Sequence, residues 1–552
     1  MEAALDEFTA YYQDFLVGTY DCVDRIVLNA YFAMGHSAPG FRHWWRLLNG
    51  SDESLDNNHL MRMAGRFSRR LYAYAKAHSL PVKPCEISER KHEIAEEYLA
   101  KNPEVKGLFL VLVAKAKASA WKVHRGDGAY LNLYKAKRGS YVNHYYFHIN
   151  DPEWGHITIR MCGHPPFPAM IILNGHEYAA CQLTKAGRCF GKEGNCFTEI
   201  KDTSDLTLVA DALRHSDAIG RLSQVCEQWI YSACLCFALS SEEQERTGFR
   251  YQFSVYQAEY SRNLHFKDGI QMEQLFDSVI DRTRSTLDVS LIKTILGMKR
   301  RPRRRRAHKA ARREEIVVET PTYNLTVFKL HFGALTFKGY TKGERTLRFE
   351  AIVHNTRDLR CGRVIEKFPD IVTCLQGLLQ QFLNVLQCVD APFLADSTWE
   401  TLPAPSQVGA CRVGGIDVNK PRMRATMGAV VTLAAQPNGF SASDLASAVC
   451  RQTGQTSQAY GPTRAAYDLK KLRGKNLVVK VGKSRRYTPT PEGLRAITAL
   501  SVLRDKVLKP LLAGVTSGER GPQPATVSPL DEHYETIRGE MKLLLNELRI
   551  AA

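Results

Sequence analysis

The period of apolar and polar positions changes several times along the chain, and each change marks a new kind of element. In "LMRMAGRFSRRLYAYAKA" (residues 60–77), apolar residues recur at spacings of three and four, which predicts an amphipathic helix. Over residues 126–163 the period shifts towards two, and aromatic and β-branched residues accumulate. This pattern predicts a β-hairpin that turns at "NDPEWG". We therefore expect a helical N-terminal region at residues 1–120 and a mixed α+β body with an antiparallel sheet at residues 121–391.

Beyond the body, the pattern predicts a smaller C-terminal module. Residues 392–424 are rich in proline and glycine and are interpreted as a linker. After them, "GFSASDLASAVC" predicts a capped helix, and "TRAAYDLKKLRGKNL" predicts a basic amphipathic helix. "LVVKVGKSRRYTPTPEGLRAI" predicts two short strands and a final helix. The fold class is thus α+β, with the module at residues 425–515 and a terminal helix at residues 529–552.

The terminal helix carries an apolar stripe in which spacings of four and three alternate over about three heptads. The stripe consists of Leu530, Tyr534, Ile537, Met541, Leu544 and Leu548. Two interpretations stay open. Either the helix packs on its own module, or residues 530–548 form a homodimer interface.

Charge points to a polyanionic partner. The 552 residues include 75 Lys and Arg against 57 Asp and Glu, a formal net charge of +18, which favours binding to nucleic acid. Ten of the fifteen residues from Lys299 to Arg313 are cationic, so this segment is expected to be an exposed arm. The arm includes the consecutive arginines Arg303, Arg304, Arg305 and Arg306. For the body, single-stranded DNA and structured RNA stay open as partners beside double-stranded DNA.

Several classes of protein lack support in the sequence. The longest apolar runs are about half of a membrane span, and the N-terminus does not resemble a secretory signal, so a cytoplasmic protein without a membrane partner is expected. The motifs GxxxxGK[ST], GxSxG and HExxH are absent. The histidines between residues 144 and 176 fit no usual spacing of zinc ligands, and we interpret them as core or sheet-surface residues.

The segment "GYTKGERTLRFEAIVHN" (residues 339–355) is the best candidate for chemistry. Its period of two separates an apolar face from a face that carries Arg348 and Glu350. If the hairpin loop centres on Glu344, Tyr340 lies opposite Arg348, and Lys338 lies opposite Glu350. A shift by one residue would separate these groups, so the register decides whether a site forms.

Such a group has the parts that DNA strand transfer needs. Tyr340 can form a phosphotyrosyl linkage, and Lys342 and Arg348 can stabilise charge on a phosphate. Glu350, with Glu259 on the strand "YQFSVYQAEYSRN", can hold Mg²⁺ or Mn²⁺ through carboxylate oxygens. The alternative is a sheet that is structural or only contacts DNA, with no cofactor. Whether the protein is an enzyme stays open.

The C-terminal module resembles a winged helix-turn-helix domain of the MarR-like kind, through "DLKKLRGKNLVVKVGKSRRYTPTPEG". In that family a recognition helix enters the major groove and the wing contacts the DNA backbone. The resemblance implies helix contacts from Thr463, Arg464, Tyr467, Lys470 and Lys471, and wing contacts from Lys483, Ser484, Arg485 and Arg486. The alternative is a winged helix that binds protein and whose charges are only solvated.

The body resembles, locally, the rolling-circle replication initiators of plasmids and the nicking proteins of filamentous phage. Those proteins carry Tyr-Asp-Lys followed by Arg-x-Glu; here Thr341 replaces the aspartate, and only His148 stands where a His-hydrophobic-His motif is needed. The whole chain resembles a widespread group of long bacterial proteins of mobile-element type that end in a winged helix. We therefore expect a nucleic-acid-binding protein of a mobile or replicating genetic element. The alternatives are a metal-dependent nickase or transposase-like enzyme and a winged-helix transcription regulator.

Overall fold

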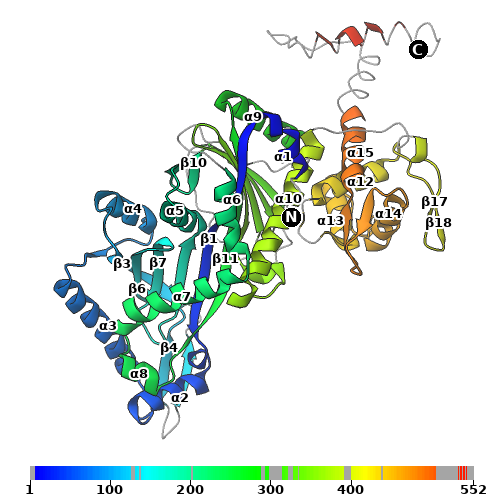
Figure 1. The fold of residues 1–552 in the computed structure, drawn as a ribbon. Coiled ribbons are helices and arrows are strands. Elements are labelled where there is room, and N and C mark those ends of the chain that lie inside the picture. Colours follow the sequence, from blue (N-terminus) through cyan, green and yellow to red (C-terminus); the bar gives the residue numbers. More distant parts are fainter. Residues whose placement is uncertain are drawn as a thin grey trace. The chain divides into compact units, whose positions relative to one another are not determined.

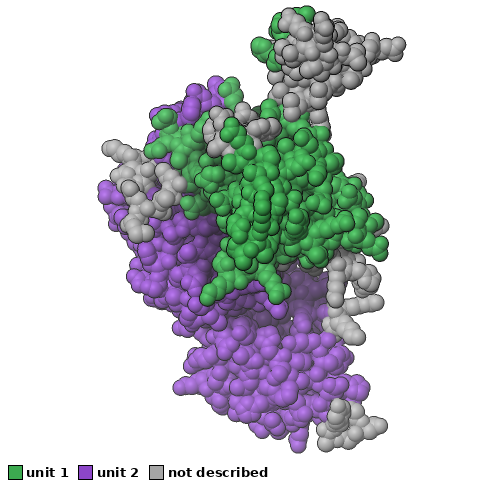
Figure 2. Space-filling model, turned by 90° about the vertical axis from the view of Figure 1, so that its right-hand side faces the viewer, with its two compact units in different colours: residues 1–14, 273–293, 380–552 green, residues 15–272, 294–379 purple. Residues whose placement is uncertain are grey.

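The computed structural model shows an α+β protein (Figure 1). It describes residues 6–125, 131–135, 139–200, 203–286, 293–296, 314–320, 327–332, 335–390, 400–434, 436 and 439–504, and short stretches between 532 and 543. Two compact units are distinguished by colour in Figure 2. Unit 1 comprises Met1–Asp14, Glu273–Lys293 and Gln380–Ala552, and unit 2 comprises Phe15–Met272 and Thr294–Leu379.

The main feature of unit 2 is a mixed sheet of twelve strands, in which the described pairings are antiparallel except for the last pair, β3 with β2. Across the sheet the strands are β12 (Lys293–Leu296), β13 (Glu314–Thr320), β14 (Val327–Phe332), β15 (Leu335–Lys342), β16 (Thr346–Val353), β11 (Tyr251–Phe266), β1 (Leu16–Phe32), β8 (Ala169–Asn174), β7 (Gly155–Cys162), β6 (Ser140–Asp151), β3 (Gly107–Ala118) and β2 (Val82–Pro84). The turn predicted between β6 and β7 and the strands predicted at β8 and β11 are present.

The N-terminal 120 residues are not uniformly helical, which corrects the sequence-based expectation. Helices α2 (Ala38–Asn49), α3 (Asn57–Ala77) and α4 (Lys91–Lys101) form there, but β1, β2 and β3 belong to the sheet. Strand β1 is 17 residues long and pairs with β8 on one side and β11 on the other. Most of its side chains are buried, so its sequence lacks the clean alternation by which a half-exposed strand is recognised.

Further helices and hairpins complete the chain up to residue 390. They are α1 (Glu7–Tyr11), α5 (Gly175–Lys185), α6 (Thr203–Asp211), α7 (Asp217–Ala233), α8 (Ser241–Arg246), α9 (Gly269–Thr286), α10 (Phe368–Asp390), the hairpin of β4 (Trp121–Arg125) and β5 (Leu131–Lys135), and the hairpin of β9 (Phe190–Glu193) and β10 (Cys196–Ile200). Helices α5 and α6 contact β1 (Figure 1). A buried cluster that includes Tyr20, Leu183, Phe197 and Leu206 joins β1 to α5, β10 and α6. These elements therefore cover one face of β1.

The C-terminal module lies in unit 1. Its elements are β17 (Ser406–Val408), β18 (Cys411–Val413), α12 (Pro421–Leu433), α13 (Ala442–Thr453), α14 (Pro462–Gly474), β19 (Val478–Lys480), β20 (Tyr487–Pro489) and α15 (Pro491–Val502). The order from α13 to α15 agrees with the prediction, whereas β17, β18 and α12 were not predicted. Helix α12 contacts α13, α14 and α15, and the buried side chains of Leu445, Leu469 and Ile497 fill the interior.

The expected linker at residues 392–424 contains folded structure. The β17–β18 hairpin lies within it, and α12 already begins at Pro421. Proline is favoured in the first turn of a helix because its missing N–H has no partner there in any case. The proline content that suggested a linker therefore belongs in part to a helix start.

Parts of the sequence-based expectation fall outside the described residues. The arm from Lys299 to Arg313, with Arg303 to Arg306, is among them. In the terminal helix, the described residues between 532 and 543 are helical, and of the apolar stripe only Ile537 is described; its side chain is exposed. Within the described part of the chain, no helix combines the length and apolar character needed to cross a membrane.

Candidate functional site

The hairpin of β15 and β16 has the predicted register. Lys338 pairs with Glu350, and Tyr340 pairs with Arg348, across a loop that begins at Gly343. Gly343 has a φ of 63°, a left-handed conformation that glycine adopts without steric strain. The phenol O–H of Tyr340 donates to Glu350 Oε1 at 2.5 Å, and Lys338 Nζ lies 3.4 Å from Glu350 Oε2. The predicted convergence on one sheet face is confirmed.

Arg348 is the centre of this group, and its side chain has no solvent exposure. Its Nη2 donates to both oxygens of Asp24, at 2.6 and 2.7 Å, and to Ser261 Oγ at 3.1 Å. Its Nη1 donates to the Asn195 carbonyl at 2.7 Å, and its Nε lies 3.3 Å from Glu350 Oε1. Two carboxylates thus compensate one buried guanidinium, as a buried charge requires.

His176 completes the buried group. Its Nδ1 lies 2.6 Å from Asp24 Oδ1, and its Nε2 lies 3.2 Å from Arg348 Nη2 and 3.4 Å from the Tyr20 hydroxyl. Burial lowers the pKa of His176 to about 4, so the ring is neutral near pH 7, with Nδ1–H facing Asp24. Although burial alone would raise it, Arg348 and His176 hold the pKa of Asp24 below its usual range.

A β-bulge in β1 places Asp24 in this group. The register of β1 against β11 shifts between Val23 and Ile26, so that Asp24 and Arg25 together lie opposite the single residue Glu259. A bulge of this kind turns a side chain out of the regular alternation of the strand. The bulge therefore explains how a carboxylate reaches Arg348 from a strand whose other residues are mostly buried and apolar.

The start of α5 places His176. Strand β8 ends at Asn174, and the helix begins at once, with the Asn174 side chain accepting from the His176 backbone N–H at 2.8 Å. Gly175 allows this close approach, because a Cβ there would lie 1.9 Å from the Val23 carbonyl oxygen. The first turn of α5 is therefore held against the bulge.

The two remaining predicted residues lie at the edge of the group. Glu259 accepts from Gln257 Nε2 at 2.7 Å, and burial, with the charge of Glu350, raises the pKa of Glu259 to about 6. Lys342 Nζ donates to the Asn195 side-chain carbonyl, and burial, with Arg348, lowers the pKa of Lys342. Among the described residues, no third histidine, cysteine or acidic side chain joins Glu259 and Glu350 at metal-binding spacing.

We call this group the Arg348 cluster; it consists of Asp24, His176, Asn195, Glu259, Ser261, Tyr340, Lys342, Arg348 and Glu350. Glu350 is placed to accept the phenol proton of Tyr340, which is the arrangement of a nucleophile and its base. Burial, followed by the charge of Glu350, raises the pKa of Tyr340 well above its usual value. Because Arg348 is enclosed, a phosphate can reach it only if residues that surround it move away.

Sequence reasoning missed Asp24, His176 and Asn195. Each is more than 100 residues from Arg348 in the chain, and only the folded sheet brings them together. One signal was available: in "CVDRIVLNA" an acidic residue interrupts an apolar strand. A charged group in such a run must find a buried partner.

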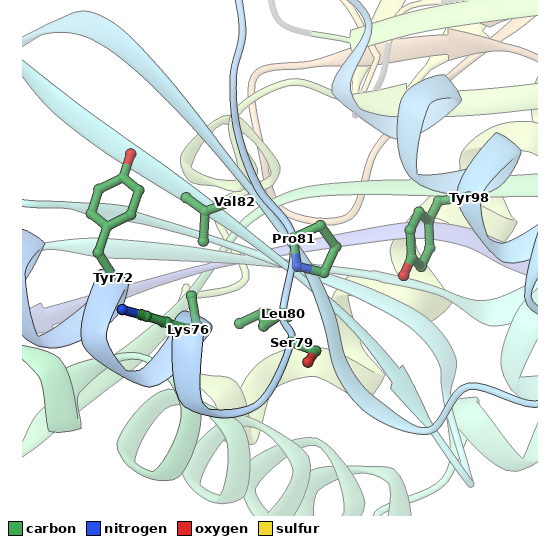
Figure 3. Close-up of a pocket in the computed structure, with 8 residues that line it drawn as sticks. Tyr72, Lys76, Ser79, Leu80, Pro81, Val82 and Tyr98 are labelled. Carbon is green, nitrogen blue, oxygen red and sulfur yellow. The ribbon is translucent and has the colours of Figure 1, made fainter.

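The structure also contains a cavity of about 440 Å³ that none of the predicted site residues lines. It lies between the end of α3, the start of β2 and Tyr98 of α4 (Figure 3). Lys76 is its one charged lining residue and lies beside Tyr72, whereas Tyr98 lies on the other side of the cavity, beyond Leu80 and Pro81. The cavity belongs to unit 2 and is separate from the Arg348 cluster in its residues.

The second candidate surface is formed by α14 and the β19–β20 hairpin of the C-terminal module. Thr463, Arg464, Tyr467, Lys483 and Arg485 are exposed, and Lys470, Lys471 and Arg486 are half-buried. Within α14 and the loop before it, Arg464 Nη1 donates to the Ala459 carbonyl at 2.5 Å. Lys471 Nζ donates to the Gly415 carbonyl at 3.1 Å, so one of its three N–H donors is already bonded within the module.

Arg486 differs from its neighbours in the hairpin. Its Nη2 donates to the Gly439 carbonyl at 2.7 Å and lies 3.9 Å from Asp444 Oδ2. These contacts fasten the hairpin to the start of α13. Lys483 and Arg485, at the tip, form no ion pair within the described part of the chain, and their cationic groups remain available.

A buried polar network sets the rotation of α14. The carboxylate of Asp468 has no solvent exposure and accepts from the Tyr460 hydroxyl at 2.9 Å and from Arg422 Nη2 at 3.2 Å. The Tyr460 hydroxyl also lies 3.0 Å from Thr426 Oγ1 on α12. Because this side of α14 is fixed towards α12, its exposed side carries Thr463 and Tyr467.

Comparison with known proteins adds one finding. No protein-family model matches the chain, and no curated protein matches its sequence. Among solved structures, the rolling circle replication initiator protein from Geobacillus stearothermophilus is similar at 11% sequence identity, over 64% of this chain and 80% of that one, with a TM-score of 0.18. A likeness at this TM-score carries no argument about fold or function.

Proposed function

We propose that the protein binds nucleic acid and recognises duplex DNA through α14 and the β19–β20 hairpin. The observation that carries this proposal is that two separate elements of one small module both expose basic and hydrogen-bonding side chains. A helix with such a surface fits the major groove, and a basic hairpin beside it suits the phosphate backbone. The net charge of +18 adds a favourable, salt-dependent term.

The side chains of α14 and of the β19–β20 hairpin suit different kinds of contact with DNA. Thr463, Tyr467 and Lys470 are spaced by four and three residues, so they lie along one face of α14. Hydroxyl and cationic groups on such a face can contact base edges and phosphates. At the hairpin tip, Gly482 has a φ of 55°, and Lys483 and Arg485 follow it in exposed positions. These two cations contribute phosphate contacts that position the module without reading sequence.

In this proposal the protein belongs to a mobile or replicating genetic element. The basic body and the arm at Lys299–Arg313 bind the nucleic-acid backbone. Tyrosine strand transfer is a second candidate function, favoured by the bond between Tyr340 and Glu350 in the presence of Lys342 and Arg348. It requires the Arg348 cluster to open, and Glu259 and Glu350 would then hold Mg²⁺ or Mn²⁺. If the cluster stays closed, the protein is a DNA-binding regulator.

The binding proposal is tested by selecting duplexes from a random-sequence DNA pool with the full-length protein. Fluorescence anisotropy then gives Kd for the selected duplex, random duplex, single-stranded DNA and a structured RNA. The double variant Tyr467→Ala, Lys470→Ala should weaken binding to the selected duplex by ~30-fold or more, since two specific contacts at about 1–3 kcal/mol each are lost. Lys420→Ala removes an exposed charge at the start of α12 and serves as the matched control.

Equal Kd values for the double variant and the Lys420→Ala control would contradict the assignment of α14 to DNA. Strand transfer is tested separately, by incubating supercoiled and single-stranded DNA with the protein and Mg²⁺ or Mn²⁺. A covalent protein–DNA adduct that disappears in Tyr340→Phe supports the second candidate. Cleavage that persists in Tyr340→Phe, or no cleavage at all, removes it.

A further inference from the structure

Two histidines and a glutamate from α4 and β7 lie together, outside both candidate surfaces. His92 and Glu96 are one helical turn apart on α4, and His92 Nε2 lies 2.8 Å from Glu96 Oε1. His156 is the second residue of β7. The three residues can each offer one ligand atom, and these atoms all lie within 4.8 Å of one another. No other set of three such residues with this spacing occurs in the described part of the chain.

The ring of His156 provides an independent sign of a ligand. Its side chain is buried, with 8% exposure, and its Nε2 lies 3.0 Å from His148 Nδ1. Its other nitrogen, Nδ1, is buried and has no hydrogen-bond partner in the described residues. A buried polar atom without a partner loses its hydration without compensation, which costs about 1–3 kcal/mol. A metal ion bound to this nitrogen would remove that penalty.

We propose that His92, Glu96 and His156 bind a divalent transition metal ion, with Zn²⁺ the best match. Two imidazoles and one carboxylate form a set of three protein ligands that zinc takes when its fourth position is open. His156 would bind through the nitrogen that His148 does not contact. His148 then acts as the outer partner that fixes the orientation of the ligand ring.

The geometry fits such an ion after a small closure. Zinc at ~2.1 Å from each ligand places the ligand atoms of a tetrahedral site ~3.4 Å apart, so the present spacing has to shrink by at most ~1.4 Å. The buried ring of His156 is held in place, but the side chains of His92 and Glu96 are 61% and 48% exposed. These two side chains can move to the ion. The ring of His92 is stacked parallel to that of His156, with centroids 5.1 Å apart, so it also has to rotate before its nitrogen points at the ion.

The ion would fasten α4 to the sheet. Helix α4 buries only one of its residues completely, Ala95, which packs with Phe109 and Leu110 of β3. Two metal ligands from the first half of the helix and one from β7 add a cross-link between elements that are more than 50 residues apart in the chain. Because His92 and Glu96 are exposed, the open fourth position faces solvent and is free to take water.

The test uses full-length protein freed of metal by chelation and then titrated with Zn²⁺ by calorimetry. Wild type should bind one equivalent at this site, and Co²⁺ should give visible absorption bands without the near-ultraviolet band of a thiolate ligand, because no cysteine takes part. The double variant His92→Ala, Glu96→Gln keeps the buried His156 and removes two exposed ligands. It should lose this site, with affinity lowered at least ~100-fold.

The matched control is His43→Ala, Glu97→Gln, which replaces the same residue types at exposed positions of α2 and α4. Zinc should also raise the melting temperature of wild type and the control but not of the ligand variant. Equal zinc affinity in the ligand variant and the control would overturn the proposal. Failure of wild type to bind Zn²⁺ or Co²⁺, or a thiolate band in the Co²⁺ spectrum as the only signal, would also overturn it.

Discussion

Arg348 compensates two carboxylates, Asp24 and Glu350, in a place that solvent does not reach. A buried charge is tolerated only when it is paired and hydrogen-bonded, and removal of one partner leaves the others uncompensated. Arg348 therefore stabilises the fold by its ion pairs, independently of any role of Tyr340. The same contacts explain why the sequence of the hairpin resembles a catalytic site. Cations and carboxylates that pair with each other can have the same spacing in the sequence as cations that bind a phosphate and carboxylates that bind a metal.

Glu259 gives a prediction about pH. Burial and the charge of Glu350 raise its pKa from 4.5 to about 6, so the folded state binds a proton more tightly than the unfolded state between these values. The wild-type protein should therefore lose about 2 kcal/mol of unfolding free energy as the pH rises through this window. Glu259→Gln removes the ionisation and should be more stable than wild type by about this amount at pH 7.

The measurement is denaturant unfolding of both proteins from pH 4 to pH 7. The difference between them should vanish below about pH 4.5, where Glu259 is protonated in both the folded and the unfolded state. Glu273→Gln, at an exposed position of α9, controls for a general effect of removing a carboxylate. A constant difference over the whole pH range would show that Glu259 is not shifted by its neighbours.

At the scale of elements, the β15–β16 hairpin could be predicted to the residue, but β1 could not. Along β16, apolar side chains such as Phe349 alternate with polar ones such as Glu350 although the whole strand is buried, because the polar side chains pair with one another; a short loop with glycine fixes the register. Strand β1 is covered on both faces, so its pattern carries no such period. Its bulge at Asp24 leaves no trace in a regular pattern, because the extra residue is defined only against β11.

We predict that substitution by alanine changes the stability of the protein in opposite directions at two glycines, Gly175 at the junction of β8 and α5 and Gly220 in α7. Gly175→Ala would place a Cβ 1.9 Å from the Val23 carbonyl oxygen, so the helix must shift, and the variant should lose about 2 to 3 kcal/mol of stability. Gly220→Ala, at an exposed position within α7, meets no atom within 4 Å and should gain about 0.5 to 1 kcal/mol.

Chemical denaturation of both variants beside wild type checks this pair. A loss in Gly175→Ala together with a gain in Gly220→Ala supports the close approach of α5 to β1. Equal effects of the two substitutions would mean that Gly175 is not held against Val23 and that another contact positions His176.

At the scale of the whole molecule, the compact units are discontinuous in the chain. Unit 1 gathers the first residues, the segment Glu273–Lys293 and everything after Gln380, and unit 2 takes the rest. Sequence reasoning places boundaries where composition changes, as at residue 392, and therefore expects continuous domains. Pairing between strands that are distant in the sequence makes this expectation wrong. Strand β1 pairs with β8 and β11, which are both more than 100 residues away from it in the chain.

The last prediction separates two ways in which a chain of charge +18 can hold DNA. Deletion of Lys299–Arg313 removes ten cations. Because we expect them to contact only the phosphate backbone, binding should weaken similarly for the selected and the random duplex. The slope of log Kd against log salt should fall by about 0.9 for each phosphate that the arm neutralises in the wild-type complex.

Lys470→Ala with Arg485→Ala should instead weaken the selected duplex more than the random one, and should reduce the slope by about 1 for each of the two cations that binds a phosphate. Anisotropy titrations over a series of salt concentrations measure both quantities. If the deletion leaves the slope unchanged, the arm does not contact DNA; if it reduces binding only to the selected duplex, the arm takes part in recognition.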